Sequence, residues 1–215
     1  MERDPEELPP LPLEAEPILE ALNAHQVQYV VIGGMALQAR GIGDRETFDL
    51  DIVPAADRPN LQQLAETLAA LDTRVITKWV PEAPELHVEE PVFEPELFER
   101  NRILHILTRH GRADVLMEVP GAVGGFAELA PDADEAQVGQ ARFAVASVLH
   151  MIRMKEAVAR PKDLEDLVGL RASLAASQVA PRPVRPLAAR RRQSERRRED
   201  EGRRRDSRRD RGIQR

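Results

Sequence analysis

The sequence predicts an α+β protein, with a mixed β-sheet flanked by helices, a pair of C-terminal helices and a disordered tail. Strand and helix patterns alternate twice between residues 27 and 71, further strand patterns follow between 101 and 146, and two helical patterns begin at residue 147. These three observations divide the chain into a disordered N-terminus at 1–12, a folded core at 13–146, a helical region at 147–178 and a disordered tail at 179–215.

The first half of the chain contains two strand-then-helix units. Residues 13–26 form an expected helix, which residues 27–34 follow as a buried strand ending in two glycines. A short helix at 35–43 and a second strand at 46–53 come next. Residues 57–71 form an amphipathic helix, because four of its leucines are spaced by three or four positions: Leu61, Leu64, Leu68 and Leu71.

The second half begins with a segment rich in proline and acidic residues, at 80–101, which we expect to be an irregular insertion that covers or flanks a site. Three strands are expected next, at 101–108, 113–119 and 139–146. A glycine-containing turn joins the first two of them. Ser147 is a suitable N-cap for a helix at 148–160, and Pro161 begins the second helix of the pair.

The composition limits the chemistry that the chain can perform. Its 215 residues include no cysteine, which excludes disulfides, thiolate zinc sites and cysteine nucleophiles, and its five histidines show no metal-ligand spacing. Any metal ion must therefore be bound by oxygen. The N-terminus is acidic and proline-rich, unlike a signal peptide, and no apolar run approaches about 18 residues. We expect a cytoplasmic protein with no membrane partner.

Charge is distributed unevenly along the chain. Residues 181–215 contain 15 arginines and 6 acidic residues, a net charge of +9, whereas the preceding residues contain 16 basic and 31 acidic residues, a net charge of −15. Three roles stay open for this arginine-rich tail: contact with nucleic-acid phosphates, a solubilising extension, or binding to the acidic body.

Paired acids in the stretch ETFDLDIV are the first candidate site residues. Side chains alternate along a strand, so Asp49 and Asp51 share one face while Leu50 and Ile52 share the other. Two partly buried carboxylates repel each other unless a cation lies between them, and carboxylate oxygens suit Mg²⁺ or Mn²⁺. An Asp-x-Asp pair is also common on solvent-facing strands. A third acid, Asp114, would converge with them if its strand lay beside theirs.

The two glycines at the end of the preceding strand supply a complementary feature. Gly33 and Gly34 lie between a strand and a helix, where backbone N–H groups and the helix dipole can hold phosphate. Phosphate and metal would then meet at one place.

These residues resemble those of a known superfamily. The stretch GGMALQARGIGDRETFDLDI resembles the nucleotidyltransferase signature of a Gly-Gly turn followed by an Arg-x-Thr-x-Asp-x-Asp strand, and GRADVL resembles the strand that carries the third acid. The stretch MKEAVARPKDLEDLVGL is similar to the helical motif of the AbiEii/AbiGii and MenT toxin branch. The resemblance covers about residues 15–175 and implies a DNA polymerase β-like nucleotidyltransferase fold.

The resemblance also implies roles for individual residues. Two metal ions would join the catalytic acids to a nucleoside triphosphate (NTP), and the third acid would help to deprotonate the acceptor hydroxyl. The metal-binding and catalytic residues would be Asp49, Asp51 and Asp114. The nucleotide-binding residues would be Gly33, Gly34, Arg45, Thr47 and Lys155, with Thr47 also orienting the strand entry. The residues that position the helical pair or the acceptor would be Arg160, Asp163 and Asp166.

Several of these residues have an ordinary structural interpretation as well. Lys155, Arg160 and Asp163 lie at a basic junction between two helices that contains a proline. Such a junction is often a solvated helix end with charge pairs. His105 and His110 flank a turn, and we expect both to be structural or solvent-exposed.

The expected function is metal-dependent transfer of a nucleoside monophosphate from an NTP to an acceptor hydroxyl. The toxin-like branch implies RNA as acceptor, such as the 3′ end of tRNA, and a separately encoded antitoxin protein as partner. The acidic body argues against a large RNA groove, so a protein hydroxyl and a small aminoglycoside-like molecule stay open. A non-catalytic module that binds a nucleotide or a partner is the alternative from another class, and the complete set of three acids favours an enzyme.

Overall fold

A computed structural model describes residues 12–43, 46–77 and 88–179. The strands are β1 (Tyr29–Ile32), β2 (Asp49–Pro54), β3 (Arg74–Ile76), β4 (Val88–Glu89), β5 (Ile103–Thr108), β6 (Gly111–Leu116), β7 (Asp134–Val138) and β8 (Ala141–Val145). The helices are α1 (Ala15–Ala24), α2 (Gly33–Ala39), α3 (Arg58–Ala70), α4 (Pro95–Arg100), α5 (Gly125–Leu129), α6 (Val148–Val158) and α7 (Pro161–Val179), with one 3₁₀ turn, η3 (Ala130–Asp132).

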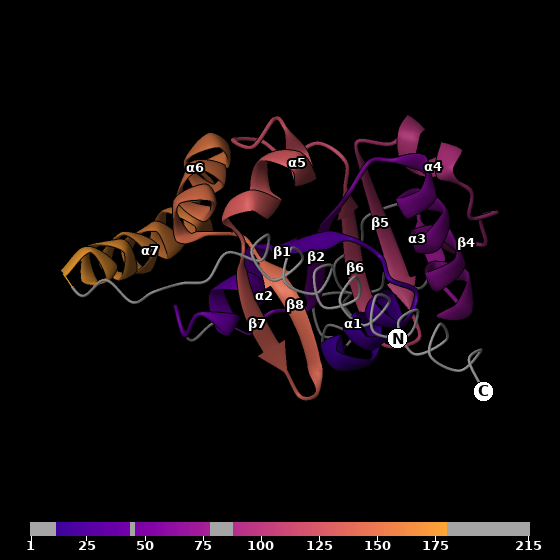
Figure 1. The fold of residues 1–215 in the computed structure, drawn as a ribbon, viewed down its shortest axis with the longest axis horizontal. Helices are drawn as coiled ribbons and strands as arrows, with labels where there is room; N and C mark the ends of the chain where they lie inside the picture. The colour runs from indigo at the N-terminus through magenta and orange to yellow at the C-terminus, as the bar shows by residue number, and fades with distance from the viewer. Residues whose placement is uncertain (1–11, 44–45, 78–87, 180–215) are drawn as a thin grey trace, which may run out of the picture.

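The described strands form one mixed sheet in the order β4-β3-β5-β6-β2-β1-β8-β7 (Figure 1). Strand β2 pairs with β6 in parallel and with β1 in antiparallel orientation, and β1 pairs with β8 in parallel. The expected α+β class, with a mixed sheet flanked by helices, is confirmed. The central position of β2 follows from its sequence, because its apolar residues favour burial between two neighbouring strands.

Side-chain alternation divides β2 and β6 into an apolar face and a polar face. Leu50, Ile52 and Val115 are at most 2% exposed and join one continuous core with buried residues of α1 and α3. The residues that alternate with them along the strands, Asp49, Asp51 and Asp114, are only partly buried and point to the opposite face. Burial of the apolar face therefore fixes the side on which the acids appear.

Both helices of the C-terminal pair begin where the sequence predicts, although α6 ends at Val158, two residues before its expected end. The Ser147 hydroxyl accepts a hydrogen bond from the backbone N–H of His150, which caps α6. Ala159 adopts a left-handed conformation at φ 54°, ending α6, and Pro161 then begins α7. Figure 1 shows α7 extending away from the sheet beyond α6.

The second part of the proline-rich segment differs from the expected irregular structure. Residues 78–87 lie outside the described part of the chain, but β4 and α4 are regular, and α4 lies beside α3. Pro95 occupies the first turn of α4, where its missing N–H costs nothing, and Phe98 is fully buried. Part of the expected insertion is therefore an integral part of the fold.

Besides β4 and α4, two further short strands and one further helix were absent from the sequence-based expectation. Strand β3 has only three residues, β7 is a polar edge strand that forms by pairing with β8, and α5 has only five residues. Such short elements depend on tertiary pairing rather than on a local pattern. The expected disordered segments fall almost entirely outside the described residues and stay predictions. No helix among the described residues is long and apolar enough to cross a bilayer.

The buried Phe98 side chain allows a test of whether α4 packs on the body of the protein. Phe98→Ala should lower the free energy of unfolding by about 3–5 kcal/mol, because it removes a fully buried side chain and leaves a cavity. Chemical denaturation measures this change. Val92→Ala is the control, since Val92 is 76% exposed in the same segment and should change stability by at most about 0.5 kcal/mol. Equal effects of the two substitutions would show that α4 does not pack on the body.

Candidate active site

Three neighbouring strands bring polar side chains into one row across the sheet. Asp51 on β2 is in register with Asp114 on β6, and Asp114 is in register with His105 on β5. Neighbouring strands lie about 4.8 Å apart, and side chains of paired residues lie on the same face. Asp49 lies on this face two residues before Asp51. The sequence-predicted acids therefore come together on adjacent strands.

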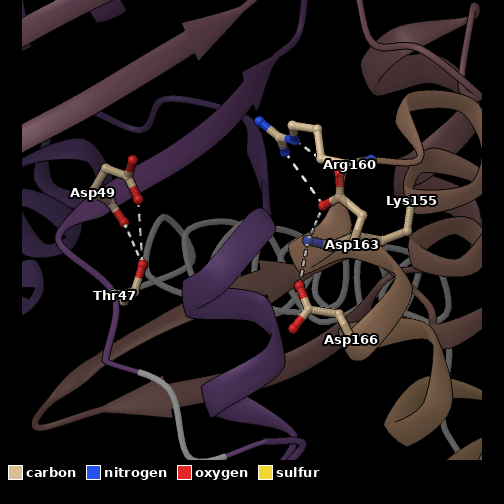
Figure 2. A network of polar contacts seen from close by, with 6 residues as sticks. All are labelled: Thr47, Asp49, Lys155, Arg160, Asp163 and Asp166. Atoms are coloured by element: carbon tan, nitrogen blue, oxygen red, sulfur yellow. Dashed lines mark hydrogen bonds and ion pairs between the residues drawn. The ribbon is translucent and has the colours of Figure 1, made fainter. Parts of the chain in front are cut away.

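Two of the three carboxylates have a hydrogen-bond partner outside the acidic group. The Thr47 hydroxyl lies 3.2 Å from the carbonyl oxygen of Asp49 and 3.3 Å from its Oδ1, so that it ties the entry of β2 to the first acid (Figure 2). His105 Nδ1 lies 2.8 Å from Oδ1 of Asp114. Thr47 thus lies just before β2 and contacts Asp49, and its role in nucleotide binding stays a prediction.

The carboxyl of Asp51 has a strongly perturbed pKa. Burial, followed by the charges of Asp49 and Asp114, raises the pKa of Asp51 to about 7, although positive charges on Lys155 and Lys162 act in the opposite direction. A carboxyl with such a pKa is protonated more readily than usual because its ionised form lacks solvation and faces like charge. A bound cation would relieve both effects.

Gly33 and Gly34, which follow β1, lie directly against Asp51 of β2 and Thr47 before it. A Cβ atom on Gly33 would lie 1.8 Å from Oδ2 of Asp51, and a Cβ atom on Gly34 would lie 2.4 Å from Oγ1 of Thr47. Gly33 also has a positive φ of 66°. Only residues without a side chain allow this approach, so the expected glycine turn and the Asp-x-Asp strand form one structural unit.

Lys155, Arg160, Asp163 and Asp166 form an ion-pair network where α6 meets α7 (Figure 2). Lys155 Nζ lies 2.8 Å from Oδ1 of Asp163 and 2.6 Å from Oδ2 of Asp166. Arg160 Nε lies 2.7 Å from the second oxygen of Asp163, whose side chain is completely buried. The two helices are therefore held together by charge as well as by apolar contact.

The network also interacts electrostatically with the acid row, by which we mean Asp49, Asp51 and Asp114. Burial alone would raise the pKa of Asp163, but hydrogen bonds from Arg160 and Lys155 outweigh it and hold that pKa well below its usual range. The pKa of Arg160 is raised, first by its hydrogen bond to Asp163 and also by the charge of Asp51. Positive groups at the helical junction thus lie close enough to the acids to interact with them.

Site prediction from the sequence was incomplete. Arg45 lies outside the described residues, so its assignment is untested. The sequence-based interpretation missed the contact of His105 with Asp114 and the exposed Lys162, whose charge acts on Asp51. It also missed the buried Arg112, which is in register with Asp49. A two-residue turn between β5 and β6 would have revealed the His105 contact, since pairing outward from that turn places His105 opposite Asp114.

The donor atoms in the row suit a hard divalent cation. Carboxylate oxygens are the ligands that Mg²⁺ and Mn²⁺ prefer. Burial first, and then the charges of Asp49 and Asp114, raise the pKa of Asp51, and a cation bound there would oppose both effects. Within the described ranges, no group of three or more acidic, histidine or cysteine side chains has the arrangement of residues around a bound metal ion.

Known proteins share this fold at low sequence identity. The lincosamide antibiotic adenylyltransferase LnuA, solved with lincomycin bound, is 15% identical over 74% of this chain and 97% of its own, with a TM-score of 0.50. The antibiotic-resistance factor ANT(2'')-Ia is 18% identical over 75% of this chain and 83% of its own, with a TM-score of 0.49. No protein-family model and no curated protein sequence matches the chain. The fold is that of the nucleotidyltransferases.

The glycine turn allows a prediction with a matched control. Gly33→Ala should destabilise the protein by more than Gly41→Ala, because both glycines have φ near 65° but only Gly33 faces an obstructing side chain. The backbone cost at Gly41 is about 1 kcal/mol, and the clash with Asp51 adds to it at Gly33. Thermal and chemical denaturation of the two variants measure the difference. Equal losses would contradict the close approach of Gly33 to β2.

The helical junction predicts a specific pH dependence. The lowered pKa of Asp163 means that its ionised form stabilises the folded state above pH 4, and that this contribution is lost as pH falls below its unfolded-state value of about 4. Asp163→Asn should therefore cost roughly 3 kcal/mol at pH 7, with a smaller difference from the wild type at pH 3. Asp72→Asn is the control, because Asp72 is 76% exposed and its pair with Arg109 contributes at most about 1 kcal/mol. A pH-independent cost at Asp163 would contradict the ionic network.

Proposed function

We propose that this protein is a nucleotidyltransferase that moves a nucleoside monophosphate from an NTP to an acceptor hydroxyl and releases pyrophosphate. The observation that carries the proposal is the placement of Asp51 beside Asp114, with Asp49 on the same face and Gly33 in direct contact with Asp51. Clustered carboxylates next to a glycine turn provide ligands for a cation and backbone N–H groups for a phosphate in one place.

Mg²⁺ or Mn²⁺ would be held by Asp49, Asp51 and Asp114. When bound, the metal would stabilise negative charge on the attacking and leaving oxygens of the transfer. Asp114 would accept the proton of the acceptor hydroxyl, and the N–H groups of the glycine turn would bind the triphosphate. Thr47 would hold the start of β2 in place through its contacts with Asp49.

The positive groups near the acids support a polyanionic substrate. Burial and the charges of Asp49 and Asp114 raise the pKa of Asp51, and the charges of Lys155 and Lys162 oppose that rise. The pKa of Arg160 is raised first by its hydrogen bond to Asp163, and the charge of Asp51 adds to this rise. Lys155 is mostly buried between two carboxylates, whereas the Arg160 side chain is 55% exposed and Lys162 is exposed. Arg160 and Lys162 are therefore better placed to meet triphosphate charge, and Lys155 would act mainly by holding α7 in position.

The acceptor is RNA in the leading version of this proposal. Its support is the resemblance of the α6–α7 stretch to the AbiEii/AbiGii and MenT toxin branch, which also implies tRNA 3′ ends as targets and an antitoxin as partner. A small hydroxylated molecule is the second candidate acceptor, because a lincosamide adenylyltransferase has the same fold. A protein hydroxyl is the third, and the non-catalytic nucleotide-binding module is the alternative to an enzyme.

A labelling experiment distinguishes these acceptors. The full chain is incubated with Mg²⁺ and each α-³²P-labelled NTP, in parallel with total RNA, total protein, and an aminoglycoside and lincosamide mixture. We expect label to enter RNA, with none transferred by Asp114→Asn. Label in the protein or antibiotic fraction would replace RNA by that acceptor, and label in no fraction would favour the binding module.

The raised pKa of Asp51 gives a paired prediction about activity and stability. Asp51→Asn should abolish transfer while stabilising the metal-free protein at pH 8, because the folded state disfavours the ionised carboxyl. Because the pKa of Asp51 is raised in the folded state, the contribution of Asp51 to the free energy of unfolding decreases from about pH 4 to pH 7. The difference in stability between Asp51→Asn and the wild type should therefore grow over that interval. Denaturation at several pH values in EDTA measures it.

Two results would contradict this assignment. Loss of stability together with activity would show that Asp51 is a structural, hydrogen-bonded acid, for which removal costs about 1–3 kcal/mol. A fully active Asp51→Asn variant would show that the acid row is not the site of transfer. The control is Asp57→Asn, at the cap of α3, which should lose at most about 1 kcal/mol and retain activity.

A further inference from the structure

His105 is a side chain from outside the acidic group that contacts one of its carboxylates. It lies on β5, directly opposite Asp114 on β6, and its Nδ1 is 2.8 Å from Oδ1 of Asp114. The His105 side chain is 42% exposed and that of Asp114 is 16% exposed. A half-exposed histidine is therefore hydrogen-bonded to a mostly buried carboxylate of the candidate site.

The contact restricts Asp114 in a defined way. A carboxylate accepts hydrogen bonds, so the ring donates from Nδ1, and the bond occupies Oδ1 while the second oxygen, Oδ2, has no hydrogen bond to any other described residue. Asp114 is next to Asp51 in the row, and the two like charges repel each other. Without an external donor, rotation of the Asp114 side chain away from Asp51 would reduce that repulsion. The histidine opposes this rotation by fixing one oxygen.

We propose that His105 is a positioning residue that orients the Asp114 carboxylate for binding of a divalent cation shared with Asp51. The inference rests on the proposed function, in which Asp114 is a metal ligand. Hydrogen-bonded partners of ligating carboxylates fix the orientation of the ligand, and their removal commonly weakens metal affinity by 10- to 100-fold. His105 would act through Asp114 and would not itself contact the metal.

The test measures metal binding without any acceptor or nucleotide. Mn²⁺ binding to the full chain is followed by the loss of the free-ion electron paramagnetic resonance signal. We expect His105→Ala to weaken Mn²⁺ binding by roughly 10- to 100-fold and His105→Asn to restore most of the affinity, because the asparagine amide can place an N–H near the position of Nδ1. The melting temperatures of both variants in EDTA should stay close to that of the wild type, since His105 is partly exposed.

Two further variants separate the inference from the proposed function. His110→Ala is the matched control, because His110 lies at the adjacent turn and pairs with Glu14 rather than with an acid of the row. It should leave Mn²⁺ affinity unchanged. Asp51→Asn should abolish binding, and unchanged binding in that variant would overturn the proposed site itself.

The remaining outcomes bear on His105 alone. Loss of binding in Asp51→Asn with unchanged affinity in His105→Ala would leave the site in place and overturn the positioning role. Weakened binding in both His105→Ala and His105→Asn, with unchanged melting temperatures, would also overturn it, because it would indicate that the imidazole itself binds the metal.

Discussion

The parallel pairing of β2 with β6 is the constraint on which the candidate site depends. This register places Asp51 beside Asp114, and burial of the apolar face of both strands forces the two carboxylates to the same side. Asp49, two residues earlier on β2, adds a third negative charge. The stability gained by burying Leu50 and Ile52 thus comes with a partly buried cluster of like charges, and burial together with the charges of Asp49 and Asp114 raises the pKa of Asp51.

The elements around the acids are consistent with this excess negative charge. The turn at Gly33 and Gly34 lies against the acid strand without a side chain, and His105 donates a hydrogen bond to one carboxylate from the opposite side of the row. At the helical junction, Arg160 and Lys162 interact electrostatically with Asp51. Negative, positive and hydrogen-bonding groups from segments far apart in the sequence therefore meet at one place.

The helical pair performs two tasks with one set of charges. Asp163 is completely buried and binds both Lys155 and Arg160, so the same ion pairs fix α7 against α6 and orient the exposed guanidinium of Arg160. A buried pair of this kind is costly to disrupt, which favours one fixed arrangement of the two helices. Lys155 is mostly buried and paired with Asp163 and Asp166, which agrees with the interpretation of this junction as a set of charge pairs. Its role in nucleotide binding stays a prediction.

Much of the fold and the identities of the three acids followed from the sequence alone. Leucine spacing predicted α3, a serine cap and a proline predicted the first residues of α6 and α7, and alternation placed Asp49 and Asp51 on one face, because these are local properties of the chain. Local patterns could not predict β3, β7 or α5, which exist through pairing and packing with distant residues. Only the tertiary structure decided which side chains meet: His105 binds Asp114 and Lys155 is enclosed by acids because strand register and helix packing are set by long-range burial.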